Sequence, residues 1–209
     1  ISIVNVFAVE EFIFESKSIE IINNNIIAKD GVKATTPDGL EIFSDNSEYN
    51  KDTKILILKK DVIVFDKVQK LELRSDNIIY NKLTEEITSN TETEIRIGDS
   101  YFLSGEDIVF LRSKFIIQSD NSTTIKDKYN NIIKLSGFKY SINKKILRTN
   151  QMEFIDNQSN IYKSNDAMID LNNDRIAAKD IQIYFAEGEL GDNARLKGNS
   201  LISENNISI

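Results

Sequence analysis

The sequence of 209 residues contains no cysteine, no histidine and no tryptophan, and it has one proline and eight glycines. The missing cysteines exclude a disulfide framework and thiolate zinc sites, and the missing histidines exclude Ser–His and Cys–His nucleophile pairs. A carbohydrate-active β enzyme without tryptophan would lack the ring that stacks best on sugars. The spacing of Asp166, Asp170 and Asp174 resembles a calcium loop only superficially, because the segment has neither the glycine nor the bidentate glutamate of such a loop. We therefore expect no catalytic residue, no metal and no cofactor.

The charge balance is acidic. Thirty-three Asp and Glu oppose 26 Lys and Arg, which gives a net charge of −7. No run of basic residues is longer than two, so the clustered basic surface that nucleic acid requires is missing, and we expect no nucleic-acid partner. The sequence is rich in Ile and Asn and has many more Lys than Arg, which indicates AT-rich codon usage. Asn then takes over turn positions that Gly fills elsewhere, because it also tolerates a left-handed backbone.

The beginning of the sequence differs from the rest. Residues 1–8 are apolar and close on Val6-Phe7-Ala8, a small-x-small pattern that fits the end of a signal peptide. The alternative for the same residues is a first β-strand, and both interpretations stay open here. Residues 9–209 are expected to form a single domain, because no Pro-, Gly- or Ser-rich linker divides them. No apolar run approaches the ~20 residues of a membrane helix.

Apolar residues recur with a period of two over most of the chain. Short runs rich in β-branched residues are bounded by Asn and Asp turn formers, as is typical of β-strands. The clearest of these runs cover residues 54–59, 62–65, 71–74, 94–97 and 181–185. Apolar spacing of the helical kind is not sustained over any helical length. The sequence therefore predicts an all-β protein with an antiparallel sheet.

An internal repeat organises these strands. The pattern Ser-Asp-Asn-x-x-Tyr-Asn-Lys-x-Thr begins at Ser44 and again 31 residues later at Ser75, with looser copies at Ser119 and Ser164. A second motif, Lys-Asp, occurs at 29–30, 60–61 and 179–180. We interpret the unit as strand, Asn/Lys turn, strand, Lys-Asp turn, strand. Such units must stack to cover their apolar faces, either in a folded antiparallel sheet or in a β-solenoid. The uneven spacing of the copies favours the folded sheet.

The order of these motifs resembles the OstA-like periplasmic domains of lipopolysaccharide transport. The resemblance extends over residues 11–198 and is most specific to the N-terminal domain of the lipopolysaccharide-assembly (LptD) family of the alphaproteobacterial type. The runs that carry it, besides the repeat, are Glu106-Asp107-Ile108-Val109-Phe110, Leu135-Ser136-Gly137-Phe138 and Ala178-Lys179-Asp180-Ile181. The family's Gly-Asn turn is often Lys-Asp in this sequence. The resemblance implies a β-jellyroll opened along one side, called a β-taco, with an apolar groove for acyl chains.

The groove implied by the resemblance would be lined by apolar residues on one face of each strand. Its candidate lipid-binding residues are Leu40, Ile42, Ile55, Ile57, Val62, Val64, Leu71, Leu73, Ile95, Ile97, Phe138, Tyr140, Ile169, Leu171, Ile181 and Ile183. Each of them could equally be an ordinary core residue. In strands that are apolar on both faces, such as 55–58, either face could point inward. Tyr49 and Tyr80, at matched positions of the repeat, are expected to pack in the core.

The resemblance also implies partners and a location. The ligand would be lipopolysaccharide, and the protein would lie in the periplasm, attached to the outer membrane. A bridge protein of the LptA type would add a strand at an exposed edge, and an outer-membrane lipoprotein of the LptE type would bind through a membrane barrel outside this segment. The candidate docking edge contains Phe12, Phe14, Ile19 and Ile21. The alternative function is a structural or adhesive β-solenoid without a lipid groove.

Overall fold

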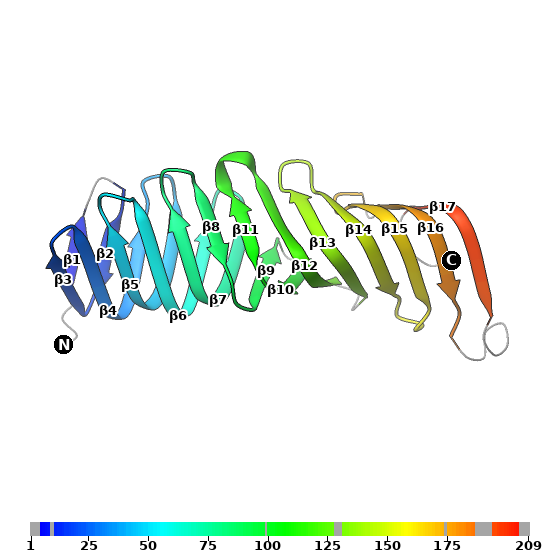
Figure 1. Cartoon of the computed structure of the whole chain (residues 1–209), viewed down its shortest axis with the longest axis horizontal. Helices are drawn as coiled ribbons and strands as arrows, with labels where there is room; N and C mark the ends of the chain where they lie inside the picture. Colours follow the sequence, from blue (N-terminus) through cyan, green and yellow to red (C-terminus); the bar gives the residue numbers. More distant parts are fainter. Residues whose placement is uncertain are drawn as a thin grey trace. The chain divides into compact units, whose positions relative to one another are not determined.

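The computed structural model describes residues 5–8, 11–98, 100–127, 131–173, 175–186 and 194–204 (Figure 1). The prediction of an all-β protein is confirmed, since the described residues form β-strands and one short 3₁₀ turn. Contacts divide the chain into two compact units. Unit 1 comprises Ile1–Gly98 and Glu106–Lys114, and unit 2 comprises Asp99–Gly105 and Phe115–Ile209. The expectation of a single domain over 9–209 stays a prediction.

Unit 1 is an antiparallel meander of long strands with short strands at its ends. Its elements are β1 (Asn5–Ala8), β2 (Ile13–Ser16), β3 (Ser18–Ile22), β4 (Asn25–Thr35), β5 (Leu40–Asn50), β6 (Ile55–Asp66), β7 (Leu71–Asn81), β8 (Glu86–Ser89), β9 (Thr93–Ile97), β11 (Ile108–Leu111) and the 3₁₀ turn η1 (Arg112–Lys114). β2 and β3 follow one another along the same edge of β4. β9 and β8 do the same along the two halves of β7. Residues 5–8, one candidate end of a signal peptide, form β1 and pair with β2.

Unit 2 repeats this plan with one short strand of five residues and six strands of ten to twelve residues. Its elements are β10 (Tyr101–Gly105), β12 (Ile116–Asp127), β13 (Ile132–Ser141), β14 (Ile146–Ile155), β15 (Ile161–Asp170), β16 (Arg175–Tyr184) and β17 (Arg195–Glu204). β12 to β17 pair in chain order, and β10 pairs with the second half of β12. Each of these pairs is antiparallel. A β-solenoid stacks its rungs as parallel strands, so the described pairings match the folded sheet and not the solenoid.

The Lys-Asp motifs do not make turns between strands, contrary to the sequence-based prediction. They lie in the middle of long strands, where the register shifts, for example between Lys59 and Val62 of β6. The backbone is left-handed at Asp30, Lys60 and Asp61, as expected of a β-bulge. A bulge bends the strand, so each long strand of unit 1 belongs to two layers. Layer A contains residues 25–29, 46–50, 55–59 and 77–81, and layer B contains residues 32–35, 40–44, 62–66 and 71–75.

The bend keeps the same side of the strand inward on both sides of the bulge. β6 buries Leu56 and Leu58 before the bend and Val62 and Val64 after it, while residues 59–61 between them are exposed. A single extra residue in a strand would turn all following side chains to the opposite face. Because three exposed residues separate Leu58 from Val62, the same face points inward on both sides of the bend. One strand thus supplies apolar side chains to both layers of a common interior.

The Asn-Lys-x-Thr part of the repeat does make turns, as predicted. The side-chain oxygen of Asn50 accepts hydrogen bonds from the backbone amides of Asp52 and Thr53. Asn81 does the same for the amides of Leu83 and Thr84. Such Asx turns satisfy backbone amides that lie beyond the end of the strand ladder. The repeat therefore encodes the hairpin turns at the layer A end of unit 1.

Candidate functional site

The interior of unit 1 contains a first group of the predicted lipid-binding residues. Seven of them are at most 1% exposed: Leu40, Ile42, Val62, Val64, Leu71, Leu73 and Ile95. Ile42, Val64, Leu73 and Ile95 are opposite one another in register on β5, β6, β7 and β9. They form a continuous apolar row across layer B. Ile97, on the same strand as Ile95, is half-buried.

Ile55 and Ile57 lie on the outer face of layer A and do not belong to this interior. Leu56 and Leu58 point inward instead and are fully buried. The matched tyrosines of the repeat indicate this inward orientation of Leu56, because Leu56 is opposite both Tyr49 and Tyr80 in the strand register. The two tyrosines are fully buried, as expected of core residues. In the run 55–58, whose inward face the sequence left open, the interior residues are therefore Leu56 and Leu58 in place of Ile55 and Ile57.

Aromatic rings hold the two layers of unit 1 against each other. The Phe12 ring lies 5.0 Å from the ring of Tyr49 and 5.9 Å from that of Tyr80, measured between centroids. Phe14, on β2 opposite Ala34 of layer B, lies 6.1 Å from Tyr49 of layer A. Edge-to-face and tilted pairs of this kind add ~0.5–1.5 kcal/mol beyond the area they bury. The interior of unit 1 is thus filled by its own side chains.

The interior of unit 2 contains most of the remaining predicted residues. Phe138, Tyr140, Ile169, Ile181 and Ile183 are all at most 5% exposed. Leu171 lies beyond the end of β15 and is half-buried. Two cross-strand rows join three of them to residues that the sequence analysis did not single out: Tyr140 and Ile169 lie in one row with Leu147 and Ile176, and Ile183 lies in the other with Ile133, Phe154 and Tyr162. Burial raises the pKa of Tyr140 to about 12, so this phenol stays neutral at physiological pH.

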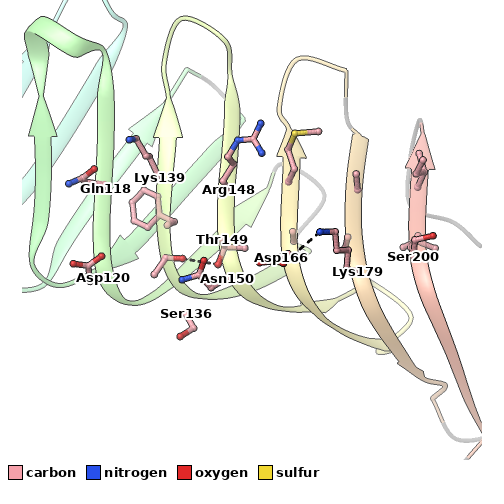
Figure 2. A pocket seen from close by; sticks show the side chains of 18 residues that line it. Gln118, Asp120, Ser136, Lys139, Arg148, Thr149, Asn150, Asp166, Lys179 and Ser200 are labelled. Atoms are coloured by element: carbon pink, nitrogen blue, oxygen red, sulfur yellow. Dashed lines mark hydrogen bonds and ion pairs between the residues drawn. The ribbon is translucent and has the colours of Figure 1, made fainter.

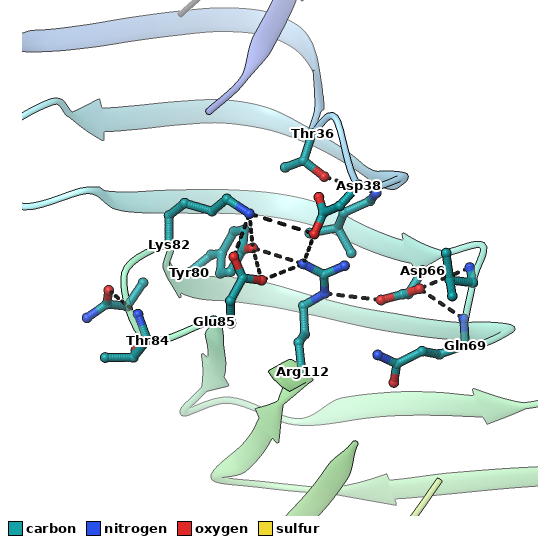
Figure 3. A network of polar contacts seen from close by, with 12 residues as sticks. Thr36, Asp38, Asp66, Gln69, Tyr80, Lys82, Thr84, Glu85 and Arg112 are labelled. Atoms are coloured by element: carbon teal, nitrogen blue, oxygen red, sulfur yellow. Dashed lines mark hydrogen bonds and ion pairs between the residues drawn. The ribbon is translucent and has the colours of Figure 1, made fainter. Parts of the chain in front are cut away.

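A buried ion network around Arg112 joins the two layers of unit 1 at their strand ends (Figure 3). Its guanidinium donates to Asp66 at the end of β6 (Nε to Oδ2, 3.1 Å) and to Asp38 in the turn after β4 (Nη1 to Oδ2, 2.9 Å). Both acids belong to the layer B end. Nη1 also donates to Glu85 Oε2 (2.6 Å) and to the Tyr80 hydroxyl (3.1 Å) at the layer A end. Arg112 itself is 6% exposed. We call this set of residues the Arg112 clasp.

The clasp perturbs the titration of its members. Burial would raise the pKa of Asp38, but hydrogen bonds from Thr36 and Arg112 and the charges of Arg112 and Lys82 outweigh it and lower that pKa to about 2. Burial and the hydrogen bond to Glu85 raise the pKa of Tyr80. The carboxyl group of Asp38 is therefore ionised and the Tyr80 phenol is neutral across the physiological range.

The outer face of unit 2 carries an open hollow of about 920 Å³ (Figure 2). Lys139 of β13 and Arg148 of β14 both line it and are directly opposite each other in the strand register. Gln118 flanks Lys139 and Met168 flanks Arg148 in the same cross-strand row. This row is offset by one residue from the buried row that contains Tyr140, so it faces outward.

The predicted docking edge is divided between two strands. β2 is paired on both sides, with β1 and with β4, and Phe12 and Phe14 are fully buried, so these two residues are not at an open edge. Ile19 and Ile21 lie on β3, where Ile19 is half-buried and Ile21 is 49% exposed. The edge of β3 that faces away from β4 is therefore the candidate docking edge.

The comparisons with known proteins give no further assignment. No protein-family model matches the chain, and no curated protein is significantly similar to it. Within the described ranges, no group of three or more acidic side chains is placed to hold a metal ion. The same residues include no helix that is long and apolar enough to cross a membrane.

Proposed function

We propose that this protein is a lipid-handling module of lipopolysaccharide transport, in which the apolar interior between the two layers of each unit receives acyl chains. The observation that carries the proposal is the set of unbroken apolar rows that run from strand to strand in each unit. Acyl chains offer no polar group for recognition, so their affinity would come from contact area, at roughly 25 cal/mol per Å². Rows without a polar interruption suit such a ligand. The order of the sequence motifs supports the same family, and no catalysis is expected.

Acyl chains can enter only where the layers separate, because interior side chains fill the present structure. In β5 to β7 the apolar interior side chains are 0–1% exposed, whereas those of β15 and β16 are 3–5% exposed. Towards the end of unit 2, Leu196 of β17, which is opposite Ile183 of the inner face, is 52% exposed. We expect the interior of unit 2 to open first, near β16 and β17. A β-taco open along one side is the corresponding fold proposal.

Photo-crosslinking in cells tests the proposal. A photoreactive residue at Ile183 or Ile169, on the inner face of unit 2, should capture lipopolysaccharide. The same residue at Gln182 or Lys163, on the outer face of the same two strands, is the matched control and should not. Equal labelling of the two pairs would overturn the proposal. Because the contact is apolar, labelling should also change little between low and moderate salt.

The proposed location and partners follow from the same assignment. The protein would work in the periplasm, attached to the outer membrane, and a bridge protein of the LptA type would pair with the edge of β3 that faces away from β4. This docking would use main-chain hydrogen bonds, so it would depend on backbone amides more than on side-chain identity.

A further inference from the structure

The positions of the two cations in the hollow of unit 2 are unfavourable for the stability of the sheet. Lys139 and Arg148 are direct cross-strand neighbours, and like charges in this position destabilise a sheet. The protein is acidic overall, so the pair cannot be ascribed to a general excess of positive charge. A local requirement for positive charge would explain why both positions are basic.

Nearby carboxylates do not neutralise the pair. Neither Lys139 nor Arg148 has an ion-pair partner among the described residues. Asp166, at the bend of β15, faces Lys179 at 3.8 Å, and Asp120 lies at the bend of β12 (Figure 2). The two acids therefore border the hollow on its bend side and leave the Lys139–Arg148 side positive.

In the other half of the same strands, a carboxylate on the neighbouring strand neutralises the cations. Lys134 of β13 and Lys163 of β15 both contact Glu153 of β14, each at 3.0 Å. Lys134 and Lys163 are thus each next to the same anion. In the Lys139–Arg148 row, the neighbours are the amide of Gln118 and the thioether of Met168.

We propose that Lys139 and Arg148 form a binding site for a phosphate group on the outer face of unit 2. The planar guanidinium of Arg148 can donate two parallel hydrogen bonds to a phosphate, and Lys139 adds a point charge beside it. Two adjacent cations match a dianion better than a single carboxylate. The amide of Gln118 can donate a further hydrogen bond to the same group. The site is on the opposite face from the apolar interior and does not depend on acyl chains binding there.

Titration with pyrophosphate tests the site, with backbone amide chemical shifts and thermal unfolding as readouts. We expect saturable binding, with shifts centred on β13 and β14, and a rise in the unfolding temperature with pyrophosphate concentration. The double variant K139Q/R148Q should bind at least about tenfold more weakly, because it loses two charge-assisted contacts. The double variant K134Q/K163Q changes the net charge by the same amount on two of the same sheet's strands, and it should bind within about twofold of the unaltered protein.

The result that overturns the proposal is an equal loss in the two double variants, or unsaturable binding by the unaltered protein. Vesicles of phosphatidylglycerol, with phosphatidylcholine as the control, separate the two sources of phosphate. Vesicle binding that is lost in K139Q/R148Q identifies a lipid headgroup, whereas binding of pyrophosphate alone identifies a soluble phosphate ester. Crosslinking through Ile183 should be unchanged in K139Q/R148Q, so failure of this site and failure of the proposed function can be distinguished.

Discussion

Replacing Arg112 by methionine should destabilise unit 1 strongly. Methionine keeps a similar length and an apolar stem but removes every hydrogen bond that the guanidinium donates. The Asp66 carboxylate, which is fully buried, would keep the backbone amides of Val68 and Gln69 as donors and lose the cation that it contacts. Glu85 and Asp38 are more exposed and can be solvated in the variant.

The size of the effect follows from this uneven burial. Breaking a buried pair by removing one partner typically costs 3–5 kcal/mol, because an uncompensated charge stays buried. Since Asp66 keeps two amide donors, we expect about 3 kcal/mol for R112M. An exposed pair contributes only ~0–1 kcal/mol. Arg74, which is 57% exposed beside Glu72, therefore provides a matched control in R74M.

Urea unfolding measures the difference. Because the chain contains no tryptophan, unfolding is followed by far-UV circular dichroism and tyrosine fluorescence. With a slope of roughly 1–3 kcal/mol per M, R112M should lower the midpoint of the unit 1 transition by on the order of 2 M, and R74M should leave it nearly unchanged. Adding D66N to R112M removes the buried charge and should recover part of the loss. Equal midpoints for R112M and R74M would refute the reasoning, since the clasp would then contribute no more than a surface ion pair.

Three further predictions concern pH, the docking edge and a bend. The pKa of Asp38 is lower in the folded protein than its ordinary value of 3.8, so its stabilisation is complete above about pH 4 and is lost as the pH falls towards 2; D38N should flatten acid unfolding in this window. I21P on β3 should abolish pull-down of a bridge partner while circular dichroism stays unchanged, whereas I21A should retain it. Gly137 has a φ of +71°, and a Cβ there would lie 3.4 Å from the carbonyl oxygens of Ser119 and Asp120, so G137A should cost ~1–2 kcal/mol in urea unfolding.

The strand content and the meander could be predicted from the sequence because both depend on local signals. The period of two and the Asn-centred turns act over a few residues, and the structure confirms the turns after Asn50 and Asn81. The function of the Lys-Asp motif could not be predicted in this way. A left-handed Asp suits a hairpin turn and a β-bulge equally well, and only the pairing of the next strand distinguishes them.

The inner face was predictable where one face of a strand is polar and ambiguous where both are apolar. Ile42 and Leu73 of layer B alternate with Glu41 and Glu72. The structure places both Ile42 and Leu73 in the interior. In the run 55–58 every residue is apolar, so the cross-strand tyrosines decide its orientation. The Arg112 clasp could not be found from sequence, because Arg112 and Asp38 are 74 positions apart and meet only after both layers have formed.

The clasp also gives the proposed function a consequence within unit 1. Acyl chains can reach the row of Val64 and Leu73 only if layers A and B separate at their strand ends, and Arg112 joins the layers there. R112M should therefore increase lipopolysaccharide crosslinking through a photoreactive residue at Val64. Crosslinking through Ile183 of unit 2 serves as the internal control and should not change. A variant that remains folded at the assay temperature, yet shows no gain at Val64, would mean that chains do not enter unit 1 by this route.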